Sequence, residues 1–75
     1  MNTHDMADRI KKYMLKKRIN KIKLEDIVET IHKYTNLSKK EILSFVWEIA
    51  SERIFRINIE RIGEDFYLFL GEEND

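Results

Sequence analysis

The spacing of the apolar residues changes once along this chain, near residue 54, and this change limits the fold to helices followed by strands. Up to that point apolar side chains recur every three or four residues, the period of an amphipathic helix. After it, Ile57 and Ile59 alternate with polar residues, and a second apolar run occupies residues 66–70. A chain of 75 residues has room for one domain. We therefore predict a single α+β domain with its core at residues 8–70 and frayed ends at 1–4 and 71–75.

Two helices and a short strand are predicted in the first half of the chain. The first helix covers residues 5–18, and Asn20, a residue type that tolerates the left-handed conformation, is its expected terminator. Residues 22–24 alternate in polarity and predict a brief strand. The second helix covers residues 25–34, with Tyr34 on its apolar stripe, and should end at Asn36 in the same left-handed way.

The third helix has the clearest start signal in the sequence. Ser38 is followed three residues later by Glu41, the spacing of a capping box, in which each side chain accepts a hydrogen bond from the other residue's backbone N–H. Leu37 and Ile42 flank the cap at the spacing of a hydrophobic staple. The helix should continue to about Glu52. Its buried face should carry Ile42, Phe45, Val46 and Ile49.

The two apolar runs at the C-terminal end predict a β-hairpin. Gly63-Glu64 fits a two-residue type II′ turn, which favours glycine at its first position. This turn fixes a register in which two apolar pairs share one face: Ile59 with Leu68, and Ile57 with Leu70.

Composition excludes several classes of function. The absence of cysteine rules out a disulfide scaffold, a thiolate zinc site and thiol catalysis, and two histidines, His4 and the exposed His32, are too few for a metal cluster. Neither a nucleophile motif nor a glycine-rich phosphate loop occurs, and no carboxylate has a partner suited to acid–base chemistry. We expect no catalysis, cofactor, metal or small-molecule ligand. With no bilayer-length apolar run and no signal peptide, we expect no membrane partner and a cytoplasmic location.

The formal net charge of zero conceals an uneven distribution. Residues 1–23 hold eight basic and two acidic side chains, whereas residues 24–75 hold six basic and twelve acidic ones. Such asymmetry suggests a charged partner for the basic segment, although a basic run is also what a solvated helix face looks like.

The order of helix, short strand, helix, tight turn, helix and hairpin resembles the winged helix-turn-helix domains of small transcription regulators. The segment from Ile22 to Leu70 carries the resemblance: a strand followed by Leu-acid-acid-Ile opens the second helix, and Asn-Leu-Ser closes the turn before the third. With the first helix included, it covers about residues 8–70. The resemblance implies that the third helix enters the major groove of double-stranded DNA, and that the hairpin, called the wing, lies beside it.

Carried onto this sequence, the resemblance implies a set of DNA contacts. The groove-facing residues of the third helix would be Ser38, Lys39, Lys40, Leu43, Ser44 and Trp47, and those of the wing would be Arg56 and Arg61. The basic cluster of the first helix would add electrostatic attraction along the backbone through Lys11, Lys12, Lys16, Lys17 and Arg18.

Two apolar residues of the third helix, Leu43 and Trp47, lie outside its core stripe and leave a second function open. They either pack under the first helix or the hairpin, or contact thymine methyl groups or a protein partner. The wing tip, with Glu64 and Asp65, is acidic, as is Glu48. The alternative to DNA binding is therefore a winged-helix module for protein–protein interaction that binds no DNA.

Apolar residues on other predicted surfaces favour a homodimer. Leu15 on the first helix, and Tyr67 and Phe69 on the outer hairpin face, are candidates for its interface. A chain this short has a stability margin of roughly 3–5 kcal/mol from its core, to which burial in a dimer would add. Twofold symmetry would also match a palindromic DNA site.

Overall fold

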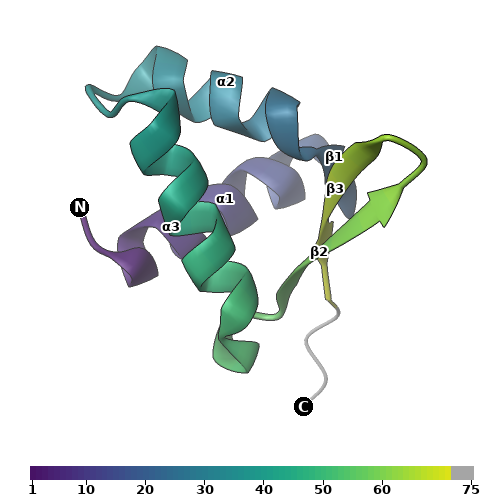
Figure 1. Ribbon diagram of the computed structural model, residues 1–75. Helices are drawn as coiled ribbons and strands as arrows, with labels where there is room; N and C mark the ends of the chain where they lie inside the picture. Colours follow the sequence, from purple (N-terminus) through teal and green to yellow (C-terminus); the bar gives the residue numbers. More distant parts are fainter. Residues whose placement is uncertain (72–75) are drawn as a thin grey trace.

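Three helices and a three-stranded antiparallel sheet make up residues 1–71, the part of the chain that the computed structural model describes (Figure 1). In chain order the elements are α1 (Thr3–Lys17), β1 (Lys21–Lys23), α2 (Leu24–Tyr34), α3 (Lys39–Ser51), a 3-10 turn (Arg53–Phe55), β2 (Ile57–Ile62) and β3 (Asp65–Leu70). The predicted α+β class is confirmed, and three helices with a C-terminal hairpin are compatible with a winged-helix layout. The predicted frayed tail, apart from Gly71, lies outside the described residues.

The sheet joins the C-terminal hairpin to the short strand near the N-terminal end, in the order β1-β3-β2. The hairpin has the predicted register, with Ile59 opposite Leu68 and Ile57 opposite Leu70. On the other edge of β3, Ile22 of β1 lies opposite Leu68. The central strand is therefore β3, and the inner face of the sheet is apolar.

The core lies where the inner face of the sheet meets the three helices. In Figure 1, α3 crosses in front of α1, α2 lies above them, and the sheet closes the right side. The largest fully buried side chains are Met6, Ile10, Met14, Ile27, Ile42, Val46, Ile49, Ile57 and Leu68. No polar or charged residue is buried within residues 1–71, so the core that positions α3 is held by apolar packing.

Helix α1 begins and ends earlier than predicted. Asn2 Oδ1 accepts a hydrogen bond from the Asp5 N–H at 2.9 Å, and this cap makes residues 3 and 4 helical instead of frayed. At the other end Arg18, with φ 57°, occupies the left-handed position expected for Asn20. Asn20 instead contacts the sheet, where its carbonyl accepts a hydrogen bond from the Leu70 N–H at 2.9 Å.

Helix α2 ends at a threonine and not at a left-handed asparagine. Thr35 has extended φ and ψ, and its hydroxyl donates to the Ile31 carbonyl at 2.8 Å, which satisfies one of the last free carbonyl groups of the helix. Asn36 has no positive φ. His32 is exposed as predicted, and its Nδ1 donates to the Leu37 carbonyl at 2.8 Å across the turn that leads to α3.

Two apolar residues that the sequence placed in the helical and alternating apolar patterns, Tyr34 and Ile54, are exposed. Tyr34 is 73% exposed because it is the last residue of α2, beyond the part of the helix that packs on the core. Ile54, where the alternating pattern was expected to begin, is 69% exposed in the 3-10 turn, while its neighbour Phe55 is buried. The turn delays the strand, which starts at Ile57.

Candidate nucleic-acid interface

The N-terminus of α3 is closed by its own side chains. Ser38 Oγ accepts from the Glu41 N–H, and Glu41 Oε1 accepts from the Ser38 N–H, both at 3.1 Å, so the predicted capping box is confirmed. Leu37 and Ile42 both pack in the core, as the staple requires. The carboxylate of Glu41 thus lies where the helix dipole would otherwise attract a phosphate. Ser38 stabilises the helix start and has its hydroxyl engaged there.

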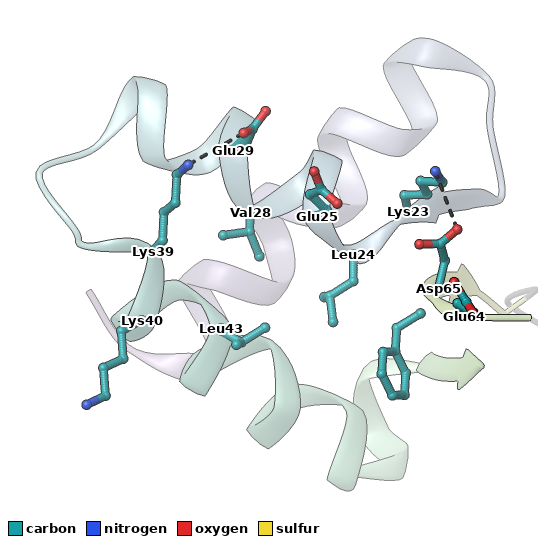
Figure 2. Close-up of a pocket in the computed structure, with 11 residues that line it drawn as sticks. Lys23, Leu24, Glu25, Val28, Glu29, Lys39, Lys40, Leu43, Glu64 and Asp65 are labelled. Atoms are coloured by element: carbon teal, nitrogen blue, oxygen red, sulfur yellow. Dashed lines mark hydrogen bonds and ion pairs between the residues drawn. The ribbon is translucent and has the colours of Figure 1, made fainter. Parts of the chain in front are cut away.

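The two lysines that follow the cap differ in their surroundings. Lys39 Nζ lies 3.5 Å from Glu29 Oε1 of α2, in an ion pair between exposed side chains. Lys40 is exposed and forms no ion pair with any residue in the described part of the chain. In Figure 2, Lys39 points toward α2 and Lys40 points away from it. Lys40 is therefore the first-turn cation of α3 that is available to a ligand.

A stripe of three residues runs along the outward side of α3. Lys40, Ser44 and Trp47 follow one another at steps of four and three, so they share one helical face, and all three are exposed. The buried residues of α3 lie on the opposite face. We call Lys40, Ser44 and Trp47 the outward stripe; it carries a cation, a hydroxyl and an indole, and the exposed Glu48, four residues after Ser44, lies at its edge. Leu43, 37% exposed, flanks it on the side of α2.

Trp47 connects α3 to the hairpin. Its ring meets that of Phe66, the second residue of β3, edge to face, with centroids 5.7 Å apart and an interplanar angle of 77°. Trp47 therefore packs against the hairpin, which is one of the two roles considered for it from the sequence. Its side chain is still 44% exposed and can also contact a partner. Its ring both fixes the hairpin to α3 and offers surface to a partner.

A groove lies between α2, α3 and the hairpin turn, beside the outward stripe (Figure 2). Its volume is about 560 Å³. Its apolar lining is formed by Leu24, Val28, Leu43 and Phe66. Charged side chains surround this lining, as Figure 2 shows: Lys23, Lys39 and Lys40 with Glu25, Glu29, Glu64 and Asp65. Of these residues, only Lys39, Lys40 and Leu43 belonged to the predicted site.

The hairpin turn has the predicted geometry and the predicted acidic tip, and its Glu64 and Asp65 line one end of the groove. Gly63 has φ 66° and Glu64 has no positive φ, as a type II′ turn requires. Arg61 Nε donates to the Gly63 carbonyl at 2.9 Å, so this predicted contact residue braces the turn. Arg56 precedes β2 at the opposite end of the hairpin, where its carbonyl accepts from the Gly71 N–H at 2.7 Å. It is therefore a residue of the hairpin base and not of the wing surface.

An ion pair connects the hairpin turn to β1. Lys23 Nζ lies 3.5 Å from Asp65 Oδ2, and both side chains are about half exposed. The negative charge of Asp65 is the main reason that the pKa of Lys23 is raised above its ordinary value. Sequence reasoning missed this pair because it depends on the pairing of β1 with β3, which joins residues more than forty positions apart.

The basic cluster of α1 lies on another side of the molecule. One face of α1 is buried in the core that it shares with α3, through Met6, Ile10 and Met14. Lys12 is about 200° around the helix from both Ile10 and Met14, so it lies on the opposite, outward face. Lys12 and Lys16 are exposed on this outward face, Lys11 is half-buried, and Lys17 Nζ lies 5.8 Å from the centre of the Tyr13 ring. Since α1 and α3 pack through their buried faces, the cluster does not extend the outward stripe.

Comparison with known proteins assigns no function to this chain, and neither does a search of residues 1–71 for a metal site or a membrane-spanning helix. No family model, curated protein or solved structure matches the sequence. Within residues 1–71, no three His, Cys, Asp or Glu side chains gather as a metal site would require. None of the helices in that range combines the length and the apolar character of a membrane span.

Proposed function

We propose that this protein binds double-stranded DNA through the outward stripe of α3, with the β2–β3 hairpin beside it. The observation that carries the proposal is the composition and placement of the stripe. Lys40, Ser44 and Trp47 face outward from a helix whose other side is fully anchored in the core. A helix of this diameter fits the major groove, and a winged-helix layout presents its third helix in this way.

Each residue of the stripe has a chemical role in such a complex. Lys40, in the first turn, would contact a phosphate and position the helix. Ser44, one turn further, would donate to or accept from a base edge, and Trp47 would pack against a thymine methyl group. The edge-to-face contact of Trp47 with Phe66 would hold the hairpin at a fixed distance from the same stretch of duplex.

The carboxylates around the stripe set the expected affinity. Glu29 is paired with Lys39, and Asp65 with Lys23, so two of the nearest negative charges are offset. With Lys40 as the phosphate contact, the plot of log K against log[salt] should have a slope of roughly −0.9, the contribution of one contact. This slope is shallow compared with that of strongly basic DNA-binding domains.

Fluorescence anisotropy with labelled duplexes at 20–200 mM salt (roughly the range over which such contacts are resolved) tests the proposal. Lys40→Glu should abolish most of the binding, and Ser44→Ala should weaken it for preferred sequences only. Lys12→Glu, the same change of charge on the outward face of α1, is the matched control. Equal losses for Lys40→Glu and Lys12→Glu, or no duplex binding at low salt, would contradict the proposal.

The groove favours a second candidate function, the binding of a protein segment. Its apolar lining is formed by the partly exposed Leu43 and Phe66 together with the buried Leu24 and Val28, and apolar surface rimmed by charge is typical of protein interfaces. Leu43→Glu separates the two functions, because it places a charge in the groove and leaves the outward stripe intact. A chain that retains duplex binding with this variant uses the stripe and not the groove.

A further inference from the structure

We propose that the outer face of the sheet is the surface through which two copies of this chain associate, with Lys23 of each copy facing Glu60 of the other. This association goes beyond the proposed DNA binding and does not depend on it, because the outward stripe of α3 lies outside the sheet. The outer sheet face is defined by alternation with the buried Ile57 and Leu68 and the partly buried Ile22, which face the core. Its residues are Lys21, Lys23, Asn58, Glu60, Ile62, Asp65, Tyr67 and Phe69.

The strand registers arrange six of these residues in two rows across the sheet, and Asp65 lies beside Ile62 at the turn end. In one row Lys21 lies beside Phe69, and Phe69 beside Asn58. In the other row Lys23 lies beside Tyr67, and Tyr67 beside Glu60. The face therefore has lysines along its β1 edge, aromatic rings along its centre, and a polar or acidic edge on β2.

The aromatic centre of this face has no cover from the rest of the described chain. Tyr67 and Phe69 are not among the residues that pack against the core, and both rings are partly exposed. Lys21 Nζ lies 5.5 Å from the centre of the Tyr67 ring, so this exposed lysine lies over the aromatic centre of the face. Two neighbouring rings at the centre of a sheet are suited to burial against a second aromatic surface.

Charge selects one of the two ways in which the face can meet a copy of itself. A twofold axis across the strands would place β1 over β1, so lysines would meet lysines. A twofold axis parallel to β3 places β1 of each copy over β2 of the other, so that Lys23 meets Glu60 twice and the rings meet at the centre. The second arrangement places Asp65 of β3 opposite its own copy. It alone brings Lys23, which pairs with Asp65 within its own chain, against a carboxylate of the other copy, which is why we commit to it. Face-to-face packing of two sheets then leaves the helices on the outside.

The size of the face sets the strength of the association. Three strands are ~14 Å wide and six residues are ~20 Å long, which is a small interface. We therefore expect association in the micromolar range, weakened by salt because the Lys23–Glu60 contacts are at its rim.

Charge reversal in two separate variants tests the arrangement. Sedimentation velocity at low salt, across micromolar concentrations, should show a monomer–dimer equilibrium for the wild-type chain. Lys23→Glu places two carboxylates opposite each other, and Glu60→Lys places two lysines opposite each other, so each variant alone should be monomeric. An equimolar mixture of the two variants should dimerise again, because both contacts between residues 23 and 60 are then between opposite charges. Circular dichroism verifies that each variant is folded.

Matched controls separate this interface from others. Lys12→Glu and Glu48→Lys change the charge equally on α1 and α3 and should leave the association constant unchanged. A wild-type chain that is monomeric at several hundred micromolar overturns the proposal, as does a mixture that stays monomeric. Dissociation by Leu15→Glu, with no effect of the two sheet variants, would place the interface on α1 instead.

Discussion

The contact between Trp47 and Phe66 gives the sharpest test of how the hairpin is attached to α3. The two side chains are 44% and 42% exposed, so each buries somewhat more than half of its surface. Full burial of a large apolar side chain contributes about 1.5–3 kcal/mol, so either alanine substitution should lower the free energy of unfolding by about 1–2 kcal/mol. The edge-to-face geometry should add a coupling of about 0.5–1.5 kcal/mol between the two residues.

A double-mutant cycle measures that coupling directly. Urea unfolding of the wild type, Trp47→Ala, Phe66→Ala and the double variant, followed by far-ultraviolet circular dichroism, gives the four free energies. The double variant should lose less stability than the sum of the two single losses, and each single variant should melt roughly 4–8 °C lower per kcal/mol. Trp47→Ala combined with Leu15→Ala, on another side of the molecule, is the control cycle and should be additive within about 0.5 kcal/mol. Additivity of Trp47 with Phe66 would refute the attachment of the hairpin through this contact.

Three further outcomes follow from the described geometry. Ser38→Ala removes the hydroxyl of the capping box and should lower the free energy of unfolding by about 1 kcal/mol in urea titration. Gly63→Ala should cost about 1–2 kcal/mol through its φ of 66° alone, because nothing lies within 4 Å of the added Cβ; equal stability in thermal melts would exclude a strained turn. Asp65 raises the pKa of Lys23 above 10.5, so the stabilisation from this pair is complete below pH 10.5 and is lost as the pH rises through the higher folded pKa. Melts between pH 9 and 12 should therefore decline less in Lys23→Met than in the wild type.

The parts of the fold that depend on near neighbours could be predicted from the sequence. The capping box at Ser38 needs only residues three positions apart, and the hairpin register follows from the turn at Gly63 and the alternation around it. Both predictions are confirmed. The starts and ends of α1 and α2 were less accurate, because the side chains of Asn2 and Thr35 and the strand pairing of Asn20 decided them.

The composition of the site could be predicted only in part, because several members arrive through long-range packing. Lys23 joins the hairpin turn through the pairing of β1 with β3, and Phe66 meets Trp47 across two elements. Glu29 reaches Lys39 from the neighbouring helix. None of these contacts leaves a periodic signal in the sequence, whereas the exposed Lys40 and Ser44 could be placed by helical spacing alone.

The separation of α1 from α3 determines how the uneven charge of the chain acts on a DNA duplex. The smallest dimension of the molecule is 24 Å, and the Debye length is about 8 Å at physiological ionic strength but about 30 Å at 0.01 M salt. The lysines on the outward face of α1 therefore attract a duplex on α3 at low salt and are screened from it at physiological salt. Lys12→Glu should lower duplex affinity at about 0.01 M salt and leave it unchanged near 0.15 M, whereas Lys40→Glu should lower it at both. A loss from Lys12→Glu that persists near 0.15 M salt would mean that the duplex touches α1 itself.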